Sequence, residues 1–252
     1  MLQRIAVLSD IHGNLAALEA VTADLARRGA ERVINLGDHI SGPLWPRETL
    51  HYLMQQDWIQ IKGNHDRQLV DQAPQKHGAS DRYANQFLTE RERAWLRALP
   101  ATLMLQAEFH LFHGTPSSDT TYLLETVEHG RARLATPAEI QPRLGRPPAR
   151  VLLCGHSHLP RVVHLPENSL IINPGSVGLP AYEDDSAEPH VMETGSPHAR
   201  YALLERHNED WVVELVTVAY NYQQAADQAL RNNRPDWATG LLTGYMQPAL
   251  TS

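Results

Sequence analysis

The first 65 residues alternate short apolar runs with segments of helical periodicity, and this order restricts the chain to few architectures. Three runs have the length and composition of buried strands, at 4–9, 33–36 and 58–61. Two helical segments lie between them, at 15–28 and 47–56. A β-α-β-α-β order predicts parallel strands joined by right-handed crossovers, and therefore an α/β fold.

The rest of the chain continues this pattern less regularly. We expect a helix at 89–99, where Thr-Glu-Arg-Glu matches a capping box, a hairpin at 201–218, and two short closing helices. Two polar or proline-containing stretches, 115–149 and 179–198, are expected to be loop or cap excursions. Further short strands are expected at 109–112, 151–153, 162–165 and 170–172. No linker interrupts this order, so residues 1–252 are predicted to form a single domain.

Composition limits the classes of function. The 252 residues are 42% hydrophobic and 20% charged, as in globular proteins. No apolar run approaches the roughly 18 residues of a membrane helix, and no signal peptide is evident at the N-terminus. A formal net charge of -7 disfavours a general nucleic-acid-binding protein. Cys154 is the single cysteine and cannot form an intramolecular disulfide, which fits the cytoplasmic location that we expect.

Polar side chains gather where the predicted strands end. In open α/β sheets ligands bind beyond the carboxyl ends of the strands, so loops at these ends can face one site. Imidazole nitrogens and carboxylate oxygens together suit divalent transition metals. Five strand ends contribute such groups, namely Asp10, His12, Asp38, Asn64, His65, His113, His156 and His158.

The spacing within two of these loops suggests how the ligands divide. In extended backbone, side chains two residues apart point the same way. On this reasoning Asp10 and His12 bind one metal from one side, while His156 and His158 either do the same or divide between two metals. Glycines beside these residues allow sharp turns or a close approach to a ligand.

The short sequence blocks around these strand-end residues resemble the motifs of the calcineurin-like metallophosphoesterase superfamily. The family pattern is Asp-x-His, Gly-Asp, Gly-Asn-His followed by Asp or Glu, a lone His, and Gly-His-x-His. Every element occurs here in order across residues 10–158. The stretch Asn-Pro-Gly-Ser-Val-Gly at 173–178 is similar to the compact bacterial phosphodiesterase branch. Each block alone is a weak signal, and five in order are a strong one.

The resemblance implies a fold as well as a chemistry. The fold is a four-layer α/β/β/α sandwich, with two facing sheets, helices outside them, and a dinuclear metal site at the C-terminal ends of strands. The β-α-β-α-β order of the first 65 residues agrees with one of these sheets. The second sheet follows from the resemblance and from the later short strands.

The resemblance also implies a role for each candidate residue. A hydroxide bridging two metal ions would attack phosphorus, and His65 would protonate the leaving group. Manganese is the first expectation for the ions, and iron, zinc, nickel or cobalt also suit this ligand set. The implied ligands are Asp10, His12 and His158 for one ion, Asn64, His113 and His156 for the other, and Asp38 as the bridge.

The leading function is hydrolysis of phosphoesters, by phosphodiesterase or phosphatase action on small phosphorylated or nucleotide substrates. The Asp-Arg pair of the phosphatase motif Gly-Asp-x-Val-Asp-Arg-Gly is missing from 37–42, which disfavours a dedicated protein phosphatase and a diadenosine tetraphosphatase with that signature. A protein phosphatase-like phosphomonoesterase is the alternative. A non-catalytic scaffold of the same fold should have lost ligands or the acid, and none is lost here. A zinc hydrolase of another bond type fits the Asp and Asn ligands less well.

Residues next to these motifs have less defined roles. Asp66 is expected to orient His65 or a ligand, and His39 either faces the substrate or fills its loop. Asn173 and Ser176 are expected to shape a tight turn, and Cys154 to be buried. Seven further histidines are expected at the surface: His51, His77, His129, His164, His190, His198 and His207. Specificity is expected in 39–47, 67–87, 115–149 and 179–198, and the sequence indicates no oligomeric state.

Overall fold

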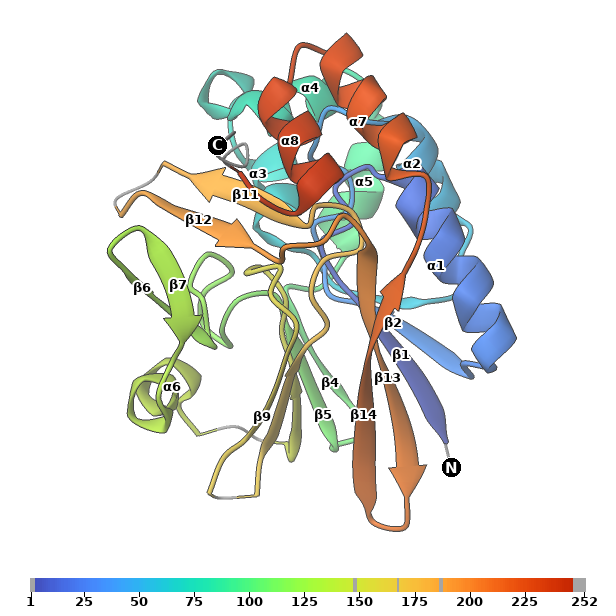
Figure 1. The fold of residues 1–252 in the computed structure, drawn as a ribbon. Coiled ribbons are helices and arrows are strands. Elements are labelled where there is room, and N and C mark those ends of the chain that lie inside the picture. The colour runs from blue at the N-terminus through green and yellow to red at the C-terminus, as the bar shows by residue number, and fades with distance from the viewer. Residues whose placement is uncertain (1–2, 147–148, 167, 186–187, 247–252) are drawn as a thin grey trace.

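Two five-stranded sheets lie face to face at the centre of the computed structural model, which describes residues 3–146, 149–166, 168–185 and 188–246 (Figure 1). The first sheet contains, in spatial order, β14 (Asp210–Val218), β13 (Ala199–His207), β1 (Arg4–Leu8), β2 (Arg32–Asn35) and β3 (Ile59–Gln60). Its β1, β2 and β3 are parallel, and this confirms the predicted β-α-β-α-β opening. Strand β13 runs antiparallel to both β1 and β14, so the sheet is mixed.

The second sheet is also mixed. It contains, in spatial order, β4 (Thr102–Leu105), β5 (Phe109–Phe112), β8 (Val151–Leu153), β10 (Leu170–Asn173) and β9 (Arg161–His164). Strands β5, β8 and β10 are parallel, while β4 and β9 are antiparallel edges. The strands predicted at 109–112, 151–153, 162–165 and 170–172 are therefore confirmed, within a residue at each end.

The two sheets bury a continuous apolar core between them. Val7 of β1 and Ile34 of β2 pack with Phe109 and Leu111 of β5, and all four side chains are almost fully buried. Burying one side chain of this size contributes about 1.5–3 kcal/mol. The sandwich is thus held together by the alternate residues of short strands that face inward.

Helices cover the outer faces of both sheets. Helix α1 (Leu15–Arg28) packs Leu18 and Val21 on the first sheet, and it ends at Gly29 in the left-handed conformation. Helix α6 (Pro137–Leu144) packs Ile140 and Leu144 on the second sheet. The predicted four-layer α/β/β/α architecture is confirmed.

The remaining helices gather at one end of the sandwich, as Figure 1 shows. Near the first sheet lie α2 (Pro46–Met54), α3 (Asn64–Asp71), α4 (Ala79–Asn85), α5 (Glu90–Ala98) and a short 3-10 turn (Pro74–Lys76). The chain closes with α7 (Tyr222–Arg231) and α8 (Pro235–Thr243), as predicted. Within the described part of the chain, no helix combines the length and apolar character needed to cross a membrane.

Strands from the two predicted loop or cap segments, 115–149 and 179–198, pair with each other in one small sheet. Residues 115–149 contain β6 (Glu125–Glu128), β7 (Arg131–Leu134) and α6, and residues 179–198 contain β11 (Ala181–Asp184) and β12 (His190–Glu193). These strands form one small sheet in the order β11-β12-β7-β6. Of the loop or cap expected at 179–198, the structure has two short strands in place of a long loop, and their pairing with a distant hairpin is not evident from this polar sequence.

Candidate active site

The loops after four strands and at the start of α3 bring the predicted site residues together. Five of these residues adopt the left-handed backbone conformation, with φ between 52° and 69°: Asp10, His12, Asp38, His156 and His158. Such φ values are uncommon outside glycine and cluster at functional sites. The extended-backbone argument for Asp10 and His12 was therefore wrong, although the two side chains do point to one place. Tight turns, and not a continued strand, aim them.

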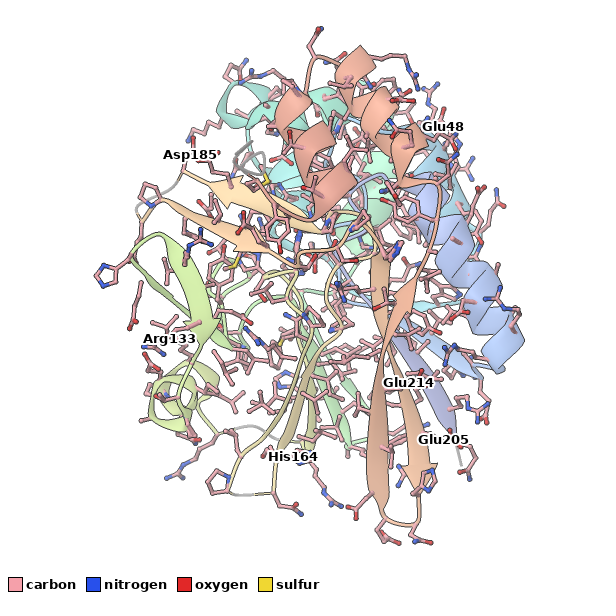
Figure 2. The ribbon with its side chains drawn as sticks, in the orientation of Figure 1. Glu48, Arg133, His164, Asp185, Glu205 and Glu214 are labelled. Atoms are coloured by element: carbon pink, nitrogen blue, oxygen red, sulfur yellow. The ribbon has the colours of Figure 1, made fainter. Side chains whose placement is uncertain are left out.

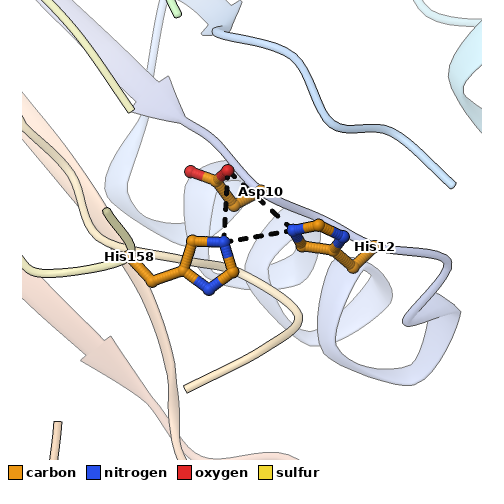
Figure 3. Close-up of side chains that lie close together, drawn as sticks. All are labelled: Asp10, His12 and His158. Atoms are coloured by element: carbon orange, nitrogen blue, oxygen red, sulfur yellow. Dashed lines mark hydrogen bonds and ion pairs between the residues drawn. The ribbon is translucent and has the colours of Figure 1, made fainter. Parts of the chain in front are cut away.

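One group of ligand atoms comes from Asp10, His12 and His158 (Figure 3). The Nε2 atom of His158 lies 3.3 Å from Asp10 Oδ1 and 3.1 Å from His12 Nε2. The distance from His12 Nε2 to Asp10 Oδ1 is 3.9 Å. A carboxylate oxygen and two imidazole nitrogens converge in this way at sites for divalent transition metals.

A second group comes from Asp38, His113 and His156, beside the first. His113 Nε2 lies 3.2 Å from Asp38 Oδ2 and 3.8 Å from Asp10 Oδ1. Asp38 Oδ2 is also 3.9 Å from His12 Nε2. Asp38 therefore lies between the two groups, and His156 and His158 divide between them.

Hydrogen bonds to the backbone fix the orientation of three of these imidazoles. The Nδ1 atoms of His12, His113 and His158 lie 2.7–2.8 Å from the carbonyl oxygens of Ser41, Leu36 and Leu179, respectively. A carbonyl can only accept, so each Nδ1 carries a proton, and in the neutral form of each ring Nε2 has the lone pair that a metal would bind. Histidines that bind metals are oriented in the same way.

Several buried polar atoms of the site have no hydrogen-bond partner among the described residues. They include Asp10 Oδ1, Asn64 Oδ1 and His113 Nε2. Leaving a buried donor or acceptor unpaired costs about 1–3 kcal/mol. Asp10 Oδ1 and His113 Nε2 belong to the two ligand groups and Asn64 lines the same pocket, so the residues present fit a pair of divalent ions.

The electrostatics of the site agree with this fit. Burial lowers the pKa of both His12 and His156 to about 4, so both rings are neutral at pH 7. Burial opposes charge on His113 as well, but Asp38 and Asp10 raise its pKa to about 10. Burial would raise the pKa of Asp10 and Asp38, yet attraction to His158 and His113 holds both below the usual range.

Two glycines allow the loops to pack this closely. A Cβ atom on Gly63 would lie 2.2 Å from Asp38 Oδ1, and one on Gly155 would lie 2.0 Å from Ser9 Oγ. Neither separation is possible for real atoms, so any side chain would displace Asp38 or Ser9. The glycines in the Gly-Asn-His and Gly-His-x-His blocks are thus steric requirements of the site.

His65 stands at the mouth of the site, and a carboxylate that the sequence analysis missed holds it. The His65 Nδ1 atom lies 2.8 Å from Asp81 Oδ1, and Ser41 Oγ donates to the same oxygen at 2.6 Å. Burial opposes charge on His65, but Asp38 and Asp81 raise its pKa to about 9. Ser41 occupies the position of the second Asp in the phosphatase motif Gly-Asp-x-Val-Asp, and the carboxylate beside it comes from Asp81 of α4.

Asp66 does not orient His65, contrary to one of the two roles expected for it. Its carboxylate accepts hydrogen bonds from the backbone N–H groups of Asp38 and His39 at 2.8 and 3.1 Å, and from Gly63 at 2.9 Å. It also contacts His39 Nδ1 at 2.7 Å. Asp66 therefore supports the loop that carries Asp38, and the fully buried His39 fills that loop and does not face the pocket.

The other neighbouring residues lie mostly as predicted. Asn173 donates to the carbonyl of Gly155 at 2.8 Å, Ser176 Oγ accepts from the N–H of Leu179 at 2.8 Å, and Cys154 is buried. These contacts confirm a tight turn that braces the site. Two predicted surface histidines, His77 and His190, are instead buried, because each hydrogen-bonds through its ring inside the fold.

A pocket of about 650 Å³ opens onto the predicted ligands and His65. Beyond them its walls come from three places: the start of α4, the strand β11 with Tyr122, and the N-terminal end of α8. The ring of Tyr122 stacks on His156 at a centroid distance of 4.7 Å, and Tyr182 meets His158 edge-on at 4.5 Å. The β11 wall therefore packs directly on the histidines of the Gly-His-x-His loop.

Comparison with known proteins gives consistent results. The chain is 24% identical over 262 residues to an uncharacterized protein of Methanocaldococcus jannaschii, covering 92% of this chain and 94% of that one. A metallophosphoesterase from Sphaerobacter thermophilus has the same fold, with a TM-score of 0.72, 23% identity, and coverage of 97% and 100%. A candidate diadenosine tetraphosphatase superposes with a TM-score of 0.54 and 17% identity, covering 88% and 96%.

A protein-family model agrees with the site and the fold. Residues 3–196 match the model described as the calcineurin-like phosphoesterase superfamily domain. The matched range includes every strand end that carries a predicted ligand. It ends before β13, β14, α7 and α8, so part of the first sheet and the α8 wall of the pocket lie beyond it. The chain belongs to the calcineurin-like phosphoesterase superfamily.

Proposed function

We propose that this protein is a dinuclear metallophosphoesterase that hydrolyses small phosphoesters, with phosphodiesters as its preferred class. The observation that carries the proposal is the pair of adjacent ligand groups with Asp38 between them, open to one pocket with His65 at its mouth. A structural metal site would be closed to solvent, whereas a catalytic one keeps an open position.

The ligand sets proposed above place one divalent ion among Asp10, His12 and His158, and another among Asn64, His113 and His156. Asp38 would contact both. Two ions at such a site supply a water of lowered pKa and neutralise charge on the phosphate oxygens. The mixed imidazole, carboxylate and amide set suits manganese, and iron, zinc, nickel or cobalt are the other candidates.

His65 is the group that would protonate the leaving oxygen. Its ring lines the pocket, and its Nδ1 atom is held by Asp81, which leaves Nε2 for the substrate. In the metal-free protein Asp38 and Asp81 raise the pKa of His65, and with ions on Asp38 the contact with Asp81 would still favour the protonated imidazole that a general acid requires. Asp81 would act as a positioning residue, because it orients His65 and favours its charged form.

The test is an assay of the purified protein, stripped and reloaded with Mn²⁺, on bis-p-nitrophenyl phosphate and p-nitrophenyl phosphate side by side. We expect turnover of the diester well above that of the monoester. Asp38→Asn should abolish turnover, and His65→Ala should reduce it by about 10²–10⁴-fold. Turnover of the monoester alone would instead support a phosphatase-like phosphomonoesterase. Binding of two ions without turnover of either ester would contradict the proposal and favour a scaffold.

A further inference from the structure

We propose, on the basis of the function proposed above, that the pocket selects phosphoesters whose only negative charge is the reacting phosphate. The substituent of the preferred substrate is neutral or cationic. Substrates that carry a second phosphate, including polyphosphates, are rejected. The observation behind this is the charge of the pocket walls.

Carboxylates dominate those walls. Among the described residues that line the pocket, Arg234 is the one arginine, and no lysine lines it. Outside the proposed metal ligands, the carboxylates lining the pocket are Asp81, Glu183, Asp184, Asp185 and Asp236. Two bound divalent ions would balance the buried ligand carboxylates and one phosphate. Asp81 pairs with His65 and Asp236 pairs with Arg234, so the negative field that an additional anion would meet comes chiefly from Glu183 and Asp185.

The one arginine is already engaged. Arg234 Nε and Nη2 donate to the two carboxylate oxygens of Asp236 at 2.9 and 2.6 Å, and Nη1 donates to Ser80 Oγ at 3.0 Å. The guanidinium also lies 5.6 Å from the ring centroid of Trp237. A paired and bidentate arginine offers little to a second phosphate, because binding would require breaking these charge-assisted hydrogen bonds.

The β11 wall combines exposed carboxylates with aromatic rings. Glu183 and Asp185 are exposed, and Figure 2 shows Asp185 at the end of β11. Between them, Asp184 interacts with the hydroxyl of Tyr122, which also contacts the hydroxyl of Tyr182 at 2.9 Å. Aromatic rings beside carboxylates tolerate a cation or a neutral group and repel a phosphate.

The expected size of the effect follows from the Coulomb energy. Charges separated by roughly 10 Å near a wet surface change an affinity by about 2–10-fold per pair at low ionic strength. Several carboxylates acting together should therefore discriminate against a second phosphate by about 10-fold or more. The discrimination should shrink at high salt, because the Debye length falls to about 3 Å at 1 M.

The test uses p-nitrophenyl diesters that all release the same product from the Mn²⁺-loaded protein. The matched pair is thymidine 5′-(p-nitrophenyl phosphate) and the same compound carrying a 3′-phosphate. A third substrate, p-nitrophenyl phosphorylcholine, supplies a cationic substituent. We expect kcat/KM for the 3′-phosphorylated compound to be at least about 10-fold below that of its partner at low salt, and the choline ester to be turned over.

Two double variants locate the effect. Glu183→Gln with Asp185→Asn should reduce the ratio of kcat/KM between the two thymidine substrates by about 3-fold or more. Glu205→Gln with Glu214→Gln makes the same change in net charge on β13 and β14, far from the pocket (Figure 2), and should leave the ratio unchanged.

The outcomes separate the two proposals. Hydrolysis of both thymidine substrates with equal efficiency, or preference for the 3′-phosphorylated one, would overturn the charge selectivity and leave the proposed function intact. The charge selectivity would also be overturned if Glu205→Gln with Glu214→Gln reduced the ratio of kcat/KM as much as Glu183→Gln with Asp185→Asn. Failure to hydrolyse any of the diesters, with metal bound, would overturn the proposed function and this inference together.

Discussion

The floor of the pocket and its walls are built in opposite ways. The floor consists of buried side chains at the ends of β1, β2, β5 and β8 and the start of α3, several of them on left-handed backbone and held by backbone carbonyls. The walls come from α4, β11 and α8, and they present exposed carboxylates and partly buried aromatic rings. Backbone geometry therefore positions the candidate metal ligands of the floor, while exposed side chains line the approach to them.

Two glycines that precede helices test this contrast with the largest expected effect. Gly63 precedes α3 on the floor, and its Cβ position lies 2.2 Å from Asp38 Oδ1. Gly78 precedes α4 on the wall, and nothing lies within 4 Å of its Cβ position. Gly63→Ala should reduce activity by about 10²-fold or more and lower the number of metal ions bound per chain, because it displaces Asp38. Gly78→Ala should stay within about 3-fold of the wild type.

Activity assays and metal analysis of the two purified variants check this prediction. Circular dichroism serves as the control that both variants fold. Equal losses in the two variants would show that the floor is no more sensitive to backbone change than the walls.

Asp81 lies where floor and wall meet, and its removal should have the next largest effect. Asp81→Asn keeps the shape of the side chain but removes the charge that favours protonated His65. We expect kcat to fall by about 10–100-fold with little change in KM, and the alkaline limb of the pH profile to move to lower pH. Ser80→Ala, one residue away, is the matched control. An unchanged pH profile in Asp81→Asn would remove Asp81 from its positioning role.

In the metal-free protein, the buried histidines of the floor should lower the free energy of unfolding on both sides of neutral pH. The raised pKa values of His65 and His113, about 9 and about 10, add stability that is present below pH 6.5 and lost as pH rises through those values. The lowered pKa values of His12 and His156, about 4, remove stability as pH falls from about 6.5 toward 4.

Urea unfolding of the metal-free protein from pH 4 to pH 10 measures this dependence. The free energy of unfolding should be highest near pH 6–7 and lower by several kcal/mol at both ends. In the quadruple variant with Ala at positions 12, 65, 113 and 156 the curve should flatten. A curve of the same shape in that variant would assign the pH dependence to other groups.

Tyr122 should give the smallest effect, because it belongs to the wall. Tyr122→Phe keeps the ring that stacks on His156 but removes hydroxyl contacts with Tyr182 and His190 at 2.9 and 3.0 Å. We expect a change of about 2–5-fold, mainly in KM, from steady-state kinetics on a diester. A loss as large as that of Asp81→Asn would mean that the β11 wall takes part in the chemistry itself.

The floor could be predicted from sequence because its ligands lie in short local blocks. Each motif follows an apolar run that forms a strand. The C-terminal ends of parallel strands lie at the same edge of a sheet, so the order of the motifs predicted that Asp10 and His158 lie close together. The local geometry was not predictable: the left-handed turns at Asp10 and His12 give the same convergence that an extended strand was expected to give.

The walls could not be predicted because they depend on contacts between distant segments. Asp81 reaches His65 from a separate helix, and β12 pairs with β7 across about 60 residues of sequence at Val191 and Arg131. The segment 179–198 is polar and proline-rich, which favours a loop until its partner strand is known. Arg234, which precedes α8, and Trp237 in its first turn belong to no motif, and only the tertiary structure places them beside the pocket.

The proposed dinuclear site is tested most directly by a crystal structure of the Mn²⁺-loaded protein, with anomalous differences measured at the manganese edge. We expect two peaks in the floor of the pocket, roughly 3.5–4 Å apart, one beside Asp10, His12 and His158 and the other beside Asn64, His113 and His156, with Asp38 touching both. A single peak, or two peaks outside these residues, would contradict the proposal.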